Sequence, residues 1–210
     1  VYSGDAEIMK QREWFRQTRV HNTVTLNNEN MVITKSKQEK WQTGNKLDVL
    51  RYTNPSYANL EHKRTVLFVD QQYFVIIDKV VGSATGNVAA HFQLKEDSKP
   101  FIDIKNNRIN TTYTDGNNLL IQSLSKDVKL VEEEGKVSYA YQKEVSRPAF
   151  RFEKQKADDK SQYFITVLYP YGNDIPKINL KSINYERLKN DEISLTLEIN
   201  DKEKTIKSNP

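Results

Sequence analysis

The chain has 210 residues, a formal net charge of +4 and a mean hydropathy of −0.76. The absence of cysteine excludes disulfides and thiolate metal sites, and the longest apolar runs are far too short to cross a bilayer, so we expect no membrane span. The mild excess of Lys and Arg permits a polyanionic partner but does not demand one. Aromatic residues make up 10% of the chain, which is enough to fill the core of half-buried sheets in one domain of this length.

The chain begins at Val1 with neither a Met nor a charged and then apolar leader, so we expect a piece of a larger protein. Residues 9–19 are the one segment with helical potential, but charged residues interrupt their apolar positions. Residues 1–23 are accordingly predicted to form an irregular arm that ends in a first strand.

The clearest element is a hairpin, formed by residues 64–69 and 73–81. Residues 73–77 are all apolar, which predicts that this second arm is buried between two layers. Residues 132–135, three Glu followed by Gly, are expected at a solvated hairpin tip, and Asn200-Asp201 in the tight turn of a final hairpin.

Period-2 alternation of apolar residues predicts the other strands. They are residues 24–26, 31–33, 49–52, 88–94, 101–104, 108–113, 119–124, 128–131, 136–141, 149–153, 163–169, 178–185, 193–199 and 202–207. The predicted fold class is all-β, an antiparallel β-sandwich of two large sheets with a short terminal group of strands. Residues 170–176 are expected to link the main sandwich to strands within 177–210, and the whole chain to form a single domain.

One segment, residues 14–23, is dense in side chains of functional type: Trp14, Arg16, Arg19, His21 and Asn22. Arg binds carboxylate or sulfate through two parallel hydrogen bonds, His ligates a metal or moves a proton, and Trp offers a flat face to a sugar ring. Together these residues predict one wall of a cleft for an acidic carbohydrate.

A purely structural interpretation of the same segment stays open. In it, His21 and Asn22 hold the entrance of a strand while Arg16 and Arg19 pair with Glu7 or Glu13, and lone histidines are usually structural.

Outside this segment the candidate residues are expected to be mainly structural. His62 lies at the start of a predicted strand and is interpreted as structural, and His91 lies within one and is interpreted as a sheet residue with a satisfied ring. Two interpretations stay open for the aromatic residues at strand spacing, sugar stacking or the core. These residues are Trp41, Tyr139, Tyr141, Tyr169 and Tyr171.

Several motifs along nearly the whole chain resemble one family. They are Tyr2-Ser3-Gly4-Asp5, residues 16–23 (Arg-Gln-Thr-Arg-Val-His-Asn-Thr), residues 62–69 (His-Lys-Arg-Thr-Val-Leu-Phe-Val), residues 73–78 (Tyr-Phe-Val-Ile-Ile-Asp), His91-Phe92-Gln93-Leu94, Ser138-Tyr139-Ala140-Tyr141, Arg147-Pro148-Ala149-Phe150 and residues 167–171 (Val-Leu-Tyr-Pro-Tyr). As a set they resemble the C-terminal β-domain of the heparinase II/III-like polysaccharide lyases, in particular the heparinase III type.

The resemblance implies a two-part enzyme that cleaves heparan sulfate-type glycosaminoglycan by β-elimination at the uronic acid. An N-terminal α/α toroid would supply most of the catalytic groups, so this chain alone is expected to contain no complete catalytic site. The resemblance also implies a periplasmic or secreted bacterial protein, and in some relatives a divalent metal, zinc or calcium. Only His21 of that ligand set maps onto this sequence, so its co-ligands would lie outside the chain.

The sequence also bears on two other classes of function. A non-catalytic carbohydrate-binding module would bind heparan sulfate as it stands. Nucleic-acid binding is not expected, because basic and aromatic residues do not interleave on one pair of strands.

Overall fold

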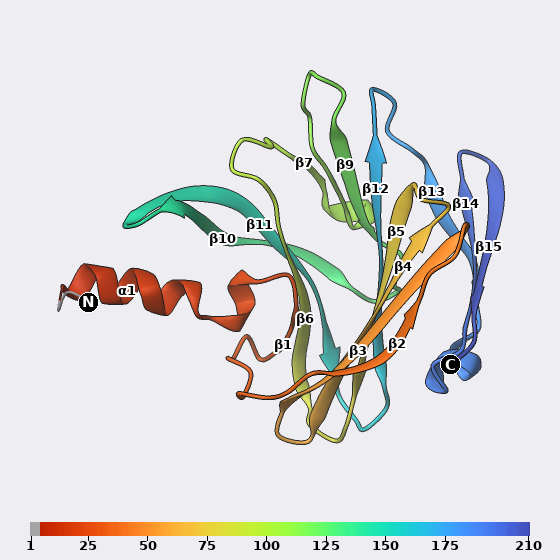
Figure 1. Ribbon diagram of the computed structural model, residues 1–210, viewed down its shortest axis with the longest axis horizontal. Helices are drawn as coiled ribbons and strands as arrows, with labels where there is room; N and C mark the ends of the chain where they lie inside the picture. Colours follow the sequence, from red (N-terminus) through yellow and green to blue (C-terminus); the bar gives the residue numbers. More distant parts are fainter. Residues whose placement is uncertain (1–4) are drawn as a thin grey trace.

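The computed structural model describes residues 5–210, and the Tyr2-Ser3-Gly4 part of the first motif lies outside the described residues. The described residues form three antiparallel sheets (Figure 1). This confirms the predicted all-β sandwich class.

The largest sheet has eight strands in the order β2-β3-β4-β5-β12-β9-β8-β7. Their bounds are β2 Lys37–Gln42, β3 Leu47–Tyr57, β4 Leu60–Val69, β5 Tyr73–Val81, β7 Phe101–Asp103, β8 Arg108–Asn110, β9 Asn118–Ser123 and β12 Gln162–Tyr171. A four-stranded sheet has the order β1-β6-β11-β10, with β1 Val24–Leu26, β6 Gly86–Gln93, β10 Lys129–Ala140 and β11 Lys143–Lys156. The third sheet contains β13 Ile178–Ile183, β14 Ile193–Ile199 and β15 Lys202–Ser208, with the short helix α2 Tyr185–Lys189 between its first two strands.

The eight-stranded sheet is the middle layer, because its two faces pack into two separate apolar clusters. One cluster joins it to the four-stranded sheet and includes Phe92, Phe150, Phe152 and Phe164. The other joins it to the terminal three-stranded sheet through residues such as Leu197. The predicted burial of β5 on both faces is largely confirmed, although Phe74 is 36% exposed.

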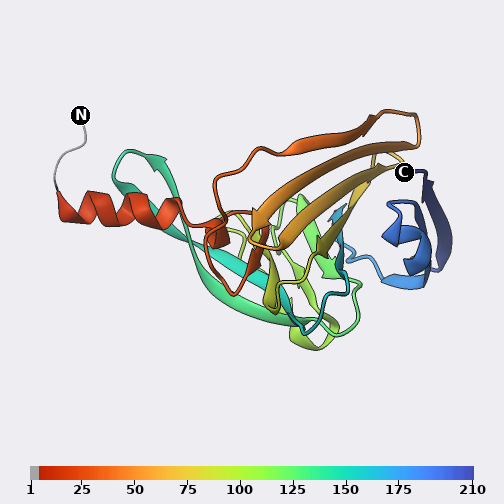
Figure 2. The same ribbon diagram turned by 90° about the horizontal axis from the view of Figure 1, so that it is seen from below.

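A helix, α1 Ala6–Phe15, replaces most of the irregular arm predicted for residues 1–23. Asp5 caps it, since its carboxylate accepts a hydrogen bond from the amide of Glu7 at 2.9 Å. The helix buries none of its residues, so it has no apolar stripe for sequence analysis to detect. It projects from one end of the molecule, and the three-stranded sheet lies at the other end (Figures 1 and 2).

The prediction of a solvated tip at residues 132–135 is wrong. These residues lie within β10, where Glu132 pairs with Phe150 and Gly135 with Arg147 of β11. Glu133 is buried, since its side chain is only 4% exposed and binds both His91 and Arg151. The long β10–β11 hairpin instead turns after Ala140.

Of three further predictions about local structure, two are wrong and one is confirmed. Residues 31–33 are not a strand. Pro170 and Tyr171 belong to β12, where they pair with β9, so the connection to β13 is shorter than predicted. Asn200 and Asp201 form the expected turn between β14 and β15, both with positive φ. Within the described part of the chain, neither helix is long and apolar enough to cross a membrane.

Candidate functional site

The segment predicted to carry function lies where α1 meets the four-stranded sheet. It comprises the end of α1, the short 3₁₀ turn η1 Thr18–Val20, and the residues that lead into β1. Thr18 and Val20 are buried and anchor the turn, while His21 and Asn22 follow it on the surface.

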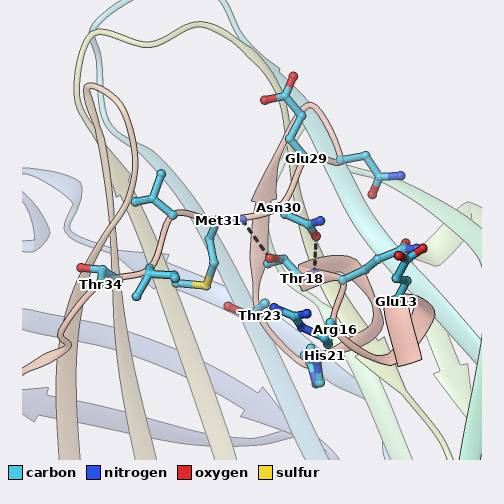
Figure 3. A pocket seen from close by; sticks show the side chains of 13 residues that line it. Glu13, Arg16, Thr18, His21, Thr23, Glu29, Asn30, Met31 and Thr34 are labelled. Atoms are coloured by element: carbon cyan, nitrogen blue, oxygen red, sulfur yellow. Dashed lines mark hydrogen bonds between the residues drawn. The ribbon is translucent and has the colours of Figure 1, made fainter. Parts of the chain in front are cut away.

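The turn is held to the following loop by two hydrogen bonds. The amide of Thr18 donates to Asn30 Oδ1 at 2.8 Å, and the Thr18 hydroxyl accepts from the amide of Met31 at 2.9 Å (Figure 3). Sequence analysis missed Asn30 as a site residue, although it ends the Asn-rich stretch 27–30. The side chain of Asn30 thus fixes one wall of the cavity beside the turn.

That cavity is open and has a volume of about 1020 Å³. Arg16, His21 and Glu13 line it from the helix and turn, and the loop of residues 28–34 forms the opposite wall (Figure 3). Arg16 is exposed, and its side chain makes no hydrogen bond or ion pair with any residue that the structure describes, although its backbone amide donates to the carbonyl oxygen of Glu13 at 3.3 Å. The expected pairing of Arg16 with Glu7 or Glu13 is therefore absent among these residues.

His21 makes one hydrogen bond through its ring. Its Nε2 lies 3.1 Å from the carbonyl oxygen of Phe15. Because a carbonyl only accepts, Nε2 must carry the proton of this bond, which leaves Nδ1 of the neutral ring with a free lone pair. His21 is thus set up to accept a proton or to ligate a cation through Nδ1.

Trp14 and Arg19 are engaged with each other rather than with this cavity. The Arg19 guanidinium carbon lies 4.6 Å from the centroid of the Trp14 ring, and Lys136 Nζ lies 4.9 Å from it. Arg19 Nε also donates to Gln17 Oε1 at 2.7 Å. The two residues line a smaller cavity between α1 and the β10–β11 hairpin.

Asn22 makes two hydrogen bonds that connect the turn to two sheets. Its Oδ1 accepts from the amide of Gln93 in β6 at 2.8 Å, and its backbone oxygen accepts from Arg64 Nη1 of β4 at 2.5 Å. Asn22 therefore takes the structural role that the alternative interpretation gave it. Of the five predicted site residues, the structure brings Arg16 and His21 together in the large cavity.

Arg64 belongs to a buried charged group that sequence analysis did not find. Its guanidinium binds both carboxylate oxygens of Asp78, which is fully buried and also bonded to His62 Nε2 at 2.6 Å. Burial alone would raise the pKa of Asp78, but the charge of Arg64 and the hydrogen bonds from His62 and Arg64 outweigh it and hold that pKa well below its ordinary value.

His91 is satisfied on both ring nitrogens, as predicted. Nε2 lies 2.8 Å from Thr25 Oγ1 and Nδ1 lies 2.6 Å from Glu133 Oε1. Burial opposes ionisation of Glu133, yet the bonds from His91 and Arg151 keep its pKa below the ordinary value. His62 has one satisfied nitrogen, since its buried Nδ1 has no partner among residues 5–210.

The aromatic residues with two open interpretations divide into two groups. Tyr169 stacks on Tyr73 at 5.2 Å, and the Tyr171 hydroxyl donates to the backbone oxygen of Thr111 at 2.7 Å, so both belong to the packed interior. Trp41, Tyr139 and Tyr141 are between 65% and 72% exposed.

The residues that the structure describes do not form a metal site on their own. No group of three or more His, Asp or Glu in residues 5–210 is placed to hold an ion. His21 is one imidazole, whereas zinc needs three or four protein ligands and calcium takes six to eight oxygen ligands.

The described residues thus form an antiparallel β-sandwich with a cavity, lined by Arg16 and His21, where α1 meets the four-stranded sheet. The sequence pattern described as "Heparinase II/III-like, C-terminal" matches residues 1–166. The chain therefore belongs to the heparinase II/III-like family and carries its C-terminal domain.

Relatives and solved structures agree with this assignment. The chain is 55% identical over 208 residues to the heparin-sulfate lyase of Pedobacter heparinus and 40% identical over 191 residues to that of Bacteroides stercoris. These matches cover 98% and 88% of this chain but 32% and 28% of the relatives.

The crystal structure of heparan sulfate lyase HepC from Pedobacter heparinus superposes with a TM-score of 0.95 at 54% identity, and a heparinase III structure with a TM-score of 0.93 at 35% identity. They cover 99% and 100% of this chain and 33% of each matched chain. The chain thus spans about a third of the length of the relatives that it matches.

Proposed function

We propose that this chain is the β-sandwich part of a polysaccharide lyase that cleaves heparan sulfate-type glycosaminoglycan by β-elimination at the uronic acid. The observation that carries the proposal is the cavity lined by both His21 and Arg16, whose side chain has no partner among residues 5–210. Heparin-sulfate lyases among the relatives supply the substrate class.

Arg16 suits the binding step of this reaction. Its guanidinium presents parallel N–H donors that match the two oxygens of a carboxylate or sulfate. Because no acidic side chain among the described residues neutralises it, the full charge is available to a polyanionic chain.

His21 suits the chemistry beside the uronate. β-Elimination requires a base for the C5 proton, stabilisation of the carboxylate as it gains enolate character, and an acid for the leaving oxygen. With Nε2 committed to the Phe15 carbonyl, His21 offers Nδ1 as an acceptor or, once protonated, as a second cationic donor to the carboxylate. The chain brings one such group to the cavity, so the remaining catalytic groups are proposed to come from a partner domain.

We propose an α/α toroid of the same protein as that partner. Large exposed apolar side chains support this: Met9 on α1, Val32 and Ile33 on the cavity wall, and Tyr139 and Tyr141 beside the hairpin turn. Ile33 is fully exposed in the described structure, and apolar surface of this kind marks an interface. A periplasmic or secreted location is part of the same proposal and follows from an extracellular polysaccharide substrate.

A divalent metal in the natural protein is a separate proposal. His21 would be one ligand through Nδ1, with the others outside residues 5–210. Zinc titration of the natural protein tests it, since binding that does not depend on His21 contradicts it.

The lyase proposal is tested by incubating the full-length natural protein with heparan sulfate, heparin, chondroitin sulfate and alginate. The expected result is an increase in ultraviolet absorbance from unsaturated uronate, largest with heparan sulfate. Absence of that product on every uronate polymer contradicts the proposal.

The competing function is a non-catalytic carbohydrate-binding module, which the open cavity of this chain also suits. Saturable heparan sulfate binding by the 210-residue chain, together with an inactive full-length protein, would favour the module.

A further inference from the structure

The backbone beside His21 is held by a buried ion pair from the middle layer of the sandwich. Arg64 uses three donors at once: Nε and Nη2 bind the two carboxylate oxygens of Asp78 at 2.7 and 3.0 Å, and Nη1 binds the backbone oxygen of Asn22 at 2.5 Å. This arrangement needs the planar fork of arginine, because a lysine offers a single charged centre.

The base of this contact is rigid. Arg64 and Asp78 are direct partners in the β4–β5 register, and the Asp78 side chain is fully buried while that of Arg64 is 21% exposed. His62 Nε2 binds the same Asp78 oxygen that accepts from Arg64 Nε. The carboxylate is thus fixed from two sides before Arg64 reaches out to Asn22.

Asn22 is held from the opposite sheet as well. Its Oδ1 accepts the amide of Gln93, which belongs to β6 of the four-stranded sheet. Asn22 is itself exposed, so burial does not fix it, and the two hydrogen bonds must do so. Its position next to His21 couples the imidazole to both sheets.

A buried ion pair is poor evidence of added stability, since well-packed apolar residues often serve as well. The third donor of Arg64 suggests a different use for the pair. We propose that Arg64, oriented by Asp78, is a positioning residue that holds the His21–Asn22 turn in the geometry needed for turnover. This inference rests on the proposed lyase function for its kinetic part but not for its structural part.

The structural part is tested on the 210-residue chain by hydrogen exchange of the backbone amide of Gln93. This amide donates its hydrogen bond to Oδ1 of the Asn22 side chain, so its exchange rate reports on the position of Asn22. Arg64→Lys retains the charge beside Asp78 and loses the three-donor fork. We expect the Gln93 amide to exchange about tenfold faster in this variant, while the amide of Leu94, bonded to the backbone oxygen of Pro148, is unchanged. Unchanged Gln93 exchange in a folded Arg64→Lys variant would overturn the proposal.

Arg51→Lys is the matched control. Arg51 is a buried arginine of the same sheet that donates to Thr65 Oγ1 at 3.0 Å and to the backbone oxygen of Asp191 at 2.6 Å, on the side of the terminal sheet. It should leave Gln93 exchange at the parent rate. If both variants speed Gln93 exchange equally, the effect is general loosening and the proposal fails.

The kinetic part uses the full-length natural protein. Misplacing a reacting group by about 1 Å costs up to roughly 100-fold in rate, so we expect Arg64→Lys to lower kcat about tenfold to 100-fold per folded molecule with a smaller change in KM. Arg51→Lys should change kcat less than threefold.

The outcomes separate the two proposals. If Arg64→Lys speeds Gln93 exchange but the full-length parent protein has no lyase activity, the lyase proposal is contradicted and the positioning contact is supported. An active parent whose kcat falls equally in both arginine variants contradicts the positioning role and leaves the lyase proposal standing.

Discussion

The two faces of the eight-stranded sheet both carry buried ion pairs, but the pairs connect to different parts of the molecule. On one face, Arg64 and Asp78 of β4 and β5 reach Asn22 beside the candidate site. On the other, Lys63 and Lys79 of the same strands bind Asp191, at 2.5 and 3.0 Å, in the connection to β14. Successive side chains of a strand point to opposite faces of the sheet. Neighbouring residues of β4 and of β5 therefore contact the candidate site on one face and the connection to the terminal sheet on the other.

The largest expected effect comes from the apolar clusters on these two faces. Phe152→Ala opens a cavity between the four- and eight-stranded sheets, and Leu197→Ala opens one beneath the terminal sheet; both side chains are fully buried. We expect losses of about 3–5 kcal/mol and 2–5 kcal/mol in the free energy of unfolding. The prediction of a single domain requires one shared transition in each variant on chemical denaturation. A separate early transition in Leu197→Ala would show that the terminal sheet unfolds by itself.

The next effect separates the two ion pairs. Asp78→Asn removes the fully buried countercharge of Arg64, so we expect a loss of about 3–5 kcal/mol. Thermal or urea unfolding measures it, with Phe74→Leu on the same strand as a mild control. A loss below about 1 kcal/mol would mean that Arg64 finds another partner.

The same carboxylate predicts how stability depends on pH. The pKa of Asp78 is lowered in the folded protein from the roughly 3.9 of an unfolded chain. Its contribution is therefore present above about pH 4 and is lost as the pH falls from there toward the folded-state value. Urea midpoints measured from pH 6 down to pH 2 should fall more steeply in the parent protein than in Asp78→Asn, and parallel curves would contradict this assignment.

On the other face the effect should be smaller. The side chain of Asp191 is 22% exposed, and its pKa is lowered because the bonds from Lys63 and Lys79 outweigh its burial. Solvent screens this group, so we expect Asp191→Asn to cost about 1 kcal/mol. An equal cost for Asp191→Asn and Asp78→Asn in urea unfolding would remove the difference between the two faces.

The sequence predicted the parts of the fold that local patterns encode. Alternation and turn residues located the β4–β5 hairpin and the turn at Asn200-Asp201. The helix α1 was not predicted, because it has a capping residue but no buried apolar stripe that would give a helical pattern in the sequence. The burial of Glu133 was not predicted, because three consecutive Glu residues are typical of a solvent-exposed segment and its partner His91 lies 42 residues away in the sequence.

The candidate site shows the same limit. Arg16 and His21 were predicted from residue type, and the structure places both at one cavity. That Trp14 and Arg19 turn toward Lys136 depends on a hairpin more than a hundred residues along the chain, which no local pattern reports. The contact between Arg64 and Asn22 joins residues that are 42 positions apart in the sequence, so no local pattern could predict it either.

The smallest effect on stability should come from the two cavity residues, and it should accompany a large effect on function. Arg16 and His21 are exposed, so Arg16→Gln and His21→Ala should change the free energy of unfolding by no more than about 0.5 kcal/mol. The most direct test is heparan sulfate turnover by the full-length natural protein, measured in parallel with unfolding. We expect His21→Ala to lower kcat/KM at least about 100-fold, equivalent to about 2.7 kcal/mol, at parental stability; turnover equal to that of the parent protein would contradict the role of His21.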